Sequence, residues 1–174
     1  MGGKAITIAG FTGSGKTYFA KAATEQNNLL VFDINNEYDL PEVPANGFTG
    51  EGRYRYTGMN FANFLDIIEL DGKRRVQNCS IIFEDMSGFL KGKAGQRFLQ
   101  IVQAKRHTNN NYYFIFHSTE LVLRDIYRFT NYFVLFRTQD TIKETAKRFP
   151  RLEQAAIKVA RNNQKYYKEI IKLQ

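Results

Sequence analysis

Apolar and aromatic runs recur along the chain at intervals that predict buried β-strands. Five such runs occur, at Ala5–Ala9, Leu29–Asp33, Ser80–Asp85, Tyr112–His117 and Asn131–Arg137. Each run is short and nearly continuous in apolar residues, which is typical of strands that are covered on both faces. Segments with helical spacing lie between the runs. The alternation predicts an α/β fold with a mostly parallel sheet that helices cover on both faces.

Two helices are predicted in the first half of the chain. The stretch from Tyr18 to Gln26 is rich in Ala and lacks Gly and Pro. Residues 61–68 place apolar side chains at the spacing i, i+3, i+4, i+7, which is one face of a helix. Asn60 is a suitable N-cap for this second helix, and Gly72 is a suitable stop.

Three more helices are predicted in the second half. Phe98, Ile101 and Val102 form an apolar stripe on a helix that leads toward residue 107. Residues 141–149 begin with a Thr-x-x-Glu capping box and end before Pro150. After residue 149 the tyrosines and isoleucines of residues 165–172 favour a last helix that packs back on the core.

The segment from Asp39 to Gly58 does not fit this alternation of strands and helices. It holds two of the three prolines and four glycines, and loops of this length are uncommon unless they are functional or disordered. Within it, Arg53-Tyr54-Arg55-Tyr56 alternates basic and aromatic residues, so a strand would place both arginines on one face. We interpret it as an edge strand with a solvated basic face, or as a contact for the phosphate backbone of DNA through Arg53 and Arg55.

Length and composition indicate one globular domain in the cytoplasm. The chain has 174 residues, of which about 1–140 are expected to form the core and 141–174 a C-terminal helical segment. It contains no apolar run long enough for a membrane span and no signal-peptide pattern. The single cysteine excludes an internal disulfide and a zinc site made of several cysteines.

The charge points to a polyanionic partner without requiring one. The formal net charge is +8 and the pI is about 9.6. Nucleic acid is one partner that such a charge favours, but solubility alone also explains it.

Residues 10–17 read Gly-Phe-Thr-Gly-Ser-Gly-Lys-Thr, a complete phosphate-binding loop of the Walker A type. It lies between a predicted strand and a predicted helix, as this loop requires. The glycines allow backbone N–H groups to approach a polyphosphate, and the helix start adds its positive dipole end. Lys16 is placed for the β- and γ-phosphates and Thr17 for Mg²⁺, so ATP and Mg²⁺ are the expected cofactors. The candidate nucleotide-binding residues are Gly10, Thr12, Gly13, Ser14, Gly15, Lys16 and Thr17.

The strand at residues 80–83 is followed by two acids, Glu84 and Asp85, which predict hydrolysis. One acid would hold Mg²⁺ and the other would orient the attacking water, as in a Walker B motif. The usual order is Asp then Glu and is reversed here, so Glu84 is the metal-side acid by position and Asp85 the catalytic one, with the assignment left open. Asp85 to Gly88 also reads D-x-x-G, but the chain lacks the N-K-x-D motif of GTPases.

Three segments resemble the HerA/FtsK superfamily of DNA-pumping ATPases. Residues 30–38 look like its second-strand motif, in which Asp33 is followed shortly by Glu37 and Tyr38. Residues 105–118 resemble its sensor strand with the preceding basic stretch, and residues 131–138 are similar to the last core strand of viral packaging ATPases and zonular-occludens-toxin-like proteins. The resemblance implies a P-loop NTPase of the RecA/ASCE type, a three-layer α/β/α sandwich with a mostly parallel central sheet.

The resemblance also implies roles for individual residues. His117 would be the sensor near the γ-phosphate, although a strand-end histidine can also be a cap or a core residue. An arginine finger from a neighbouring subunit would be Arg106, or else Arg137, whereas the plain reading of Arg106 is a solvated residue at a helix end. Asp33 and Glu37 would couple nucleotide state to movement, or else cap a turn.

The function that these observations favour is an ATP-driven motor that translocates or packages double-stranded DNA, of the viral genome-packaging type. Such a motor implies self-association into a ring, as a pentamer or hexamer, with capsid or portal partners and a location in host cytoplasm or the virion. The alternatives are a small-molecule or nucleotide kinase with a lid at residues 123–128, a filamentous-phage-type assembly ATPase, and a nucleotide-binding adaptor that does not hydrolyse.

Overall fold

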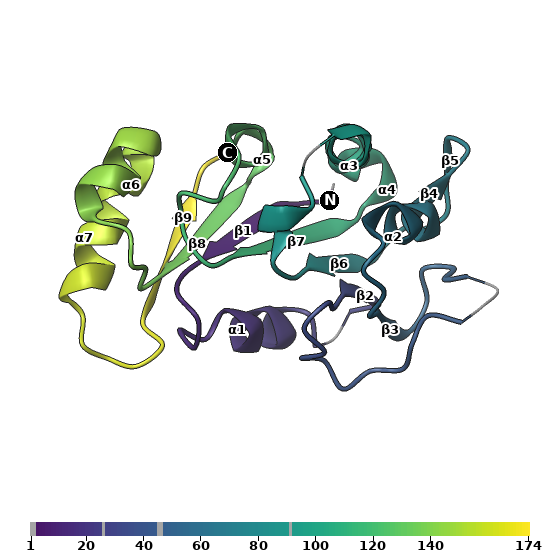
Figure 1. The fold of residues 1–174 in the computed structure, drawn as a ribbon, viewed down its shortest axis with the longest axis horizontal. Coiled ribbons are helices and arrows are strands. Elements are labelled where there is room, and N and C mark those ends of the chain that lie inside the picture. Colours follow the sequence, from purple (N-terminus) through teal and green to yellow (C-terminus); the bar gives the residue numbers. More distant parts are fainter. Residues whose placement is uncertain (1–2, 26, 45–46, 91) are drawn as a thin grey trace.

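The computed structural model of this chain describes residues 3–25, 27–44, 47–90 and 92–174. Its centre is a seven-stranded sheet in the order β3-β2-β6-β7-β1-β8-β9 (Figure 1). The strands are β1 (Ala5–Ala9), β2 (Leu29–Phe32), β3 (Arg53–Tyr56), β6 (Ser80–Phe83), β7 (Asn111–Phe116), β8 (Tyr132–Phe136) and β9 (Lys168–Lys172). All pairings are parallel except that of β8 with β9, which is antiparallel. The mostly parallel sheet predicted from the apolar runs is confirmed.

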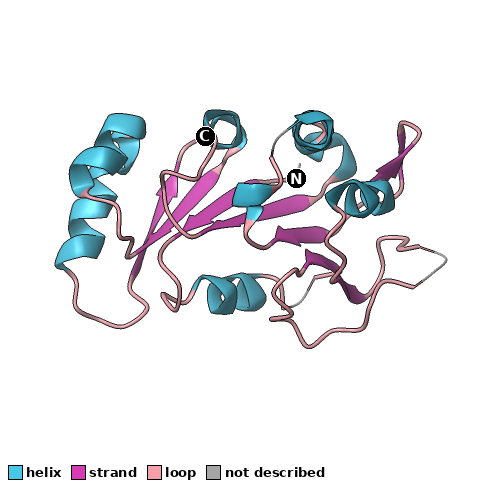
Figure 2. Cartoon of the chain, in the orientation of Figure 1, coloured by secondary structure: helices cyan, strands magenta, loops and turns pink. Residues whose placement is uncertain are grey.

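Helices cover both faces of the sheet, but unevenly. One face carries α1, and the opposite face carries α2, α3 and α5 (Figures 1 and 2). The α-helices are α1 (Lys16–Ala23), α2 (Phe61–Ile68), α3 (Gly92–Gln103), α4 (Lys105–Thr108), α5 (Arg124–Phe129), α6 (Ile142–Arg148) and α7 (Glu153–Arg161). Short 3-10 turns occur at Met86–Gly88 and Pro150–Leu152. None of the helices in the described ranges is both long and apolar enough to cross a membrane.

Alternate strand residues supply the two layers of the core. On β2, Leu29 and Val31 face the α1 side, whereas Leu30 and Phe32 join the larger cluster under α2 and α3. All four of these side chains are fully buried. A strand that is buried on both faces needs apolar residues at every position, which explains the continuous apolar runs in the sequence.

The polar residues at the ends of the predicted strands fall just beyond the observed ones. Asp33 follows β2, Glu84 follows β6, His117 follows β7 and Arg137 follows β8. Since these strands are parallel, their carboxyl ends meet at one edge of the sheet. That edge is where open α/β sheets bind ligands.

Two predicted caps are confirmed and one predicted stop is wrong. The Asn60 side chain accepts a hydrogen bond from the Asn63 N–H at 3.2 Å, and residues 141–144 form the capping box. Helix α2 ends at Ile68, not at Gly72. Asp71 and Gly72 both have positive φ and form the tight turn of a small hairpin between β4 (Glu69–Leu70) and β5 (Lys73–Arg74), because Asp-Gly suits a two-residue hairpin turn.

The predicted last helix is also wrong. Residues 168–172 form β9, which pairs antiparallel with β8 from Tyr132↔Lys172 to Phe136↔Lys168. The segment is too short for a stable helix but supplies two adjacent β-branched residues, of which Ile171 packs against the core and Ile170 is 56% exposed. The C-terminal segment therefore belongs to the central sheet, and only α6 and α7 within it are α-helical.

Candidate active site

The phosphate-binding loop connects β1 to α1 as the sequence predicts. Gly13 and Gly15 have φ of 80° and 101°, in the left-handed region that favours glycine, and Gly15 is the N-cap of α1. At Gly10 the constraint is space, because a Cβ there would lie 2.6 Å from Cβ of Phe136. The loop is anchored to β8 by the Phe11 N–H, which donates to the Arg137 carbonyl at 2.9 Å.

Lys16 lies inside the cavity that the loop borders. Its side chain is buried, and Nζ donates to the Phe11 carbonyl at 3.0 Å. Burial lowers the pKa of the Lys16 amine, and the Glu84 carboxylate opposes this change. The cavity has a volume of about 650 Å³. It is lined by Thr12, Gly13, Gly15, Lys16, Thr17, Tyr18, Glu37, Glu84, His117 and Tyr166.

Glu84 is a buried acid that faces Thr17. It is 3% exposed and accepts hydrogen bonds from the hydroxyl of Tyr38, at 2.8 Å, and from the side chain of Thr17. Burial raises the pKa of Glu84 to about 7, and the two hydroxyl donors partly offset this rise. The structure therefore brings the two predicted metal-side residues, Thr17 and Glu84, into direct contact.

Asp85 and His117 form a second polar pair beside the first. Asp85 has φ of 46°, and its Oδ2 lies 3.6 Å from His117 Nε2. The other ring nitrogen of His117 lies 3.4 Å from the Thr12 hydroxyl of the phosphate loop. His117 therefore contacts both an acid that follows β6 and the phosphate loop.

The donor set fits Mg²⁺. Mg²⁺ prefers hard oxygen ligands and is usually held by one or two protein side chains together with substrate phosphates and water. The Thr17 hydroxyl and the Glu84 carboxylate supply such oxygens at the mouth of the loop. Within the described ranges, no group of three or more His, Cys, Asp or Glu side chains is arranged to hold a metal by itself.

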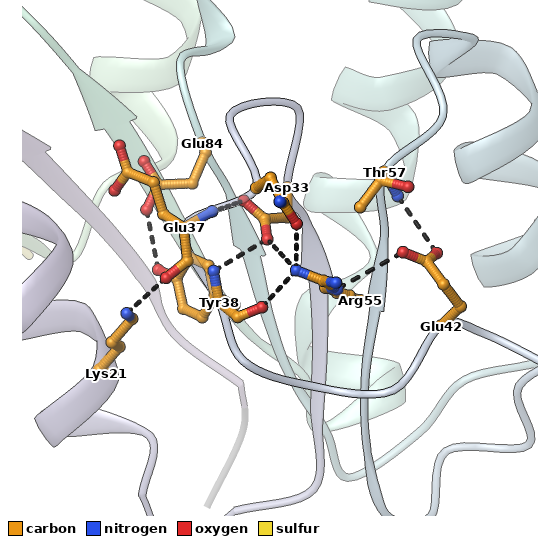
Figure 3. A network of polar contacts seen from close by, with 9 residues as sticks. Lys21, Asp33, Glu37, Tyr38, Glu42, Arg55, Thr57 and Glu84 are labelled. Atoms are coloured by element: carbon orange, nitrogen blue, oxygen red, sulfur yellow. Dashed lines mark hydrogen bonds and ion pairs between the residues drawn. The ribbon is translucent and has the colours of Figure 1, made fainter.

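Asp33 and Glu37 lie in the turn after β2 (Figure 3). Asp33 is fully buried and accepts from the N–H groups of Glu37, at 2.8 Å, and Tyr38, at 3.0 Å. Its carboxylate thus caps this turn, one of the two readings left open by the sequence. Glu37 lines the cavity, and its carbonyl accepts a hydrogen bond from Lys21.

The two candidate arginine fingers lie at opposite ends of the parallel strands. Arg106 is exposed on α4, which precedes β7 at the edge where the parallel strands begin. It therefore cannot reach the phosphate loop of its own chain. Arg137 is exposed at the other edge, where it lines a smaller cavity with Gly13 and Ser14 of the loop.

The arginines of β3 both have partners within the chain. β3 is an edge strand, as predicted, and its two tyrosines pack on the core. Arg53 donates to the carbonyls of Thr24, Glu25 and Asn27. Arg55 contacts the turn after β2, described below. This geometry favours structural roles for both, and their contact with DNA stays a prediction.

Sequence reasoning missed two tyrosines of the site. Tyr38 was noted only as part of a family-like motif, although its hydroxyl reaches Glu84. Tyr166 lines the cavity, has φ of 66° and lies against Gly15, where a Cβ would be 2.9 Å from the ring. No pattern in the sequence pointed to Tyr166, because its position depends on β9 returning the chain to the sheet.

Comparison with solved structures identifies the fold. The DNA-packaging ATPase B204 of Sulfolobus turreted icosahedral virus superposes with a TM-score of 0.74 and 17% identity, over 99% of this chain and 94% of that one. The genome packaging NTPase B204 of Sulfolobus turreted icosahedral virus 2, in complex with ATP-gammaS, gives 0.76 and 16%, over 98% and 92%. The N-terminal domain of zonular occludens toxin from Neisseria meningitidis gives 0.54 and 11%, over 100% and 96%.

Comparison of the sequence with family models and with curated proteins finds no relative. The solved structures are so low in identity that they establish the fold alone. The two kinds of protein that the sequence resembles, viral packaging ATPases and zonular-occludens-toxin-like proteins, are nevertheless both among them. This chain has the α/β fold of P-loop ATPases, and viral genome-packaging ATPases share it over nearly their whole length.

Proposed function

We propose that this chain is an ATP-hydrolysing motor that moves double-stranded DNA during viral genome packaging. One observation carries the proposal: a single cavity brings together the Walker-type lysine Lys16, the Thr17–Glu84 pair and His117, which touches Asp85. The shared fold of two packaging NTPases supports it. The net charge of +8 supports a polyanionic partner.

The chemistry assigned to the site is the transfer of the γ-phosphoryl group of ATP to water. Lys16 and the loop N–H groups bind the β- and γ-phosphates, and Thr17 with Glu84 would hold Mg²⁺. Mg²⁺ supplies charge neutralisation on the phosphate oxygens. Asp85, fixed beside His117, orients the water and accepts its proton as the new P–O bond forms and the bond to ADP breaks.

The proposal includes a ring in which each site is completed by a neighbour. Arg106 lies at the sheet edge opposite the phosphate loop, so it can act only on another subunit's nucleotide. An arginine supplied in trans stabilises charge in the transition state. Arg137 is the second candidate, because it lies beside the loop. Capsid or portal proteins are the further partners that a packaging role implies.

The segment that a kinase would use as a lid is packed into the fold, which argues against the kinase function. Residues 124–129 form α5, a crossover helix whose Ile126 is buried, and α5 packs against α3 and β1. A lid must instead swing over the acceptor. No described contact favours the adaptor or the filamentous-phage assembly function.

The test is steady-state ATP hydrolysis with and without double-stranded DNA. We expect slow basal hydrolysis that DNA stimulates, and a stimulation that decreases with salt because bound counterions are released. Lys16→Ala should abolish hydrolysis, whereas Lys143→Ala, at an exposed position on α6 away from the phosphate loop, should retain it. A hydrolysis rate that DNA does not change, together with phosphoryl transfer to a nucleoside monophosphate, would contradict the motor function and favour a kinase.

A further inference from the structure

Tyr38 and Glu84 form a buried hydroxyl–carboxylate pair. Tyr38 is 2% exposed and Glu84 is 3% exposed, and the tyrosine hydroxyl donates to Glu84 Oε1 at 2.8 Å. A hydrogen bond to a buried carboxylate is strong, and its direction is fixed by the rigid ring of the donor. One carboxylate oxygen of Glu84 is therefore held in place by a residue outside the Walker-type motifs.

The main chain of Tyr38 is held at both ends (Figure 3). Its N–H donates to Asp33 Oδ2 at 3.0 Å, and its carbonyl accepts from Arg55 Nη1 at 2.5 Å. Arg55 and Asp33 also contact each other, with Nη1 and Oδ2 3.6 Å apart. The ring is covered by Lys21, whose Nζ lies 4.8 Å from the ring centroid.

Arg55 is itself tied to the segment around β3. It lies 3.4 Å from Glu42 through Nε and also bonds the side chain of Asn36. The chain of contacts thus runs from the edge strand β3, through the backbone of Tyr38, to the acid in the nucleotide cavity. The links from Arg55 through Tyr38 to Glu84 join buried or half-buried groups, whereas Asn36 and Glu42 are exposed.

We propose that Tyr38 is a positioning residue that fixes the Glu84 carboxylate for nucleotide chemistry, and that Arg55 fixes Tyr38. This assignment rests on the proposed function, because it gives Glu84 a role in hydrolysis. By occupying Oε1, Tyr38 orients the carboxylate in the cavity beside Thr17. The partners that orient a metal-side ligand typically affect activity or metal affinity by about 10–100-fold when removed.

Tyr38→Phe is the sharpest variant, because it removes one oxygen and keeps the ring. We expect kcat for ATP hydrolysis to fall about 10-fold while KM for ATP stays within about 2-fold, since the phosphate loop is untouched. Tyr54→Phe is the matched control: Tyr54 lies on the adjacent strand and packs against Phe48, with no contact to Glu84. It should keep the wild-type kcat.

Arg55→Met tests the second link. It should lower kcat as Tyr38→Phe does, and the double variant should be no slower than the slower single variant, because both act through Glu84. Arg97→Met is the control for loss of a half-buried arginine, since Arg97 pairs with Asp66 at 2.5 Å, away from the cavity. Unchanged kcat in Tyr38→Phe, or an equal fall in Arg97→Met, would overturn the inference.

A second readout separates this inference from the proposed function. If the wild type does not hydrolyse ATP, the proposed function fails, but the orientation of Glu84 can still be measured by nucleotide binding. We then expect Tyr38→Phe to raise the Mg²⁺ concentration for half-maximal binding of a fluorescent ATP analogue about 10-fold. Equal Mg²⁺ dependence in Tyr38→Phe and wild type would overturn the positioning role.

Discussion

Glu84 is a buried acid of the cavity, and burial and hydrogen bonding act on its pKa in opposite directions. Its burial disfavours the charged form, so the pKa rises to about 7 despite two hydroxyl donors. A charged carboxylate placed so deep is costly in the empty site, and a bound cation would offset that cost.

This view predicts how stability depends on pH without Mg²⁺ and nucleotide. The folded-state pKa of Glu84 lies above the ordinary value of 4.5 for a glutamate, so the folded state binds the proton more tightly than the unfolded state does. The stabilisation from that proton, on the order of 3 kcal/mol, is fully present below pH 4.5 and is lost as pH rises through about 7. Glu84→Gln removes the charge and should raise the melting temperature at pH 8 far more than at pH 5.

Thermal unfolding in EDTA at the two pH values measures this difference. Glu25→Gln is a suitable control, because Glu25 is an exposed acid at the end of α1. A Glu84→Gln variant that shifts the melting temperature equally at both pH values would show that burial does not disfavour the charged carboxylate.

At the scale of elements, the residues that sequence reasoning placed best are those that follow buried parallel strands. Asp33, Glu84 and His117 were located because an apolar run ending in a polar residue is visible in the sequence, and parallel strands bring such ends together. The hairpin at Asp71–Gly72 and strand β9 were missed, because short local patterns fit helix and strand equally well. For β9 the open edge of β8 decided the outcome, and that edge is not a local property of the sequence.

The strand conformation of β9 predicts different effects on stability for its two adjacent isoleucines, Ile170 and Ile171. In an antiparallel strand their side chains point to opposite faces, and only Ile171 packs on the core while Ile170 is 56% exposed. Ile171→Asn should lower the free energy of unfolding by about 1–3 kcal/mol, and Ile170→Asn should lower it by less than about 0.5 kcal/mol. Denaturant unfolding measures both, and equal losses would contradict the strand.

At the scale of the whole molecule, the positions of the site and of Arg106 point to assembly. The phosphate loop lies at the carboxyl end of the parallel strands and Arg106 at their amino end. A subunit therefore presents its site at one end of the strands and its candidate finger at the other. If Arg106 is the finger proposed above, the subunits must contact each other head to tail, and such contacts form a ring when the rotation between subunits closes. Arg106 lies away from the loop because α4 directly precedes β7, at the end where the parallel strands begin.

A mixing experiment tests the composite site. Lys16→Ala has an inactive site with an intact finger, and Arg106→Ala has an intact site without one. Each alone should be inactive, and an equal mixture should recover about one quarter of wild-type hydrolysis, the share of interfaces with both intact parts. If Arg106→Ala alone hydrolyses ATP at the wild-type rate, the finger is another residue, and Arg137 is tested next.

Movement of the protein along double-stranded DNA can be measured by the displacement of a third strand. A triplex-forming oligonucleotide is bound to a double-stranded DNA, and its release is followed after ATP is added to the protein. If this chain moves DNA, release of the third strand should require ATP and Mg²⁺ and should be absent with Lys16→Ala. Brisk hydrolysis of ATP in the presence of DNA without release of the third strand would contradict it.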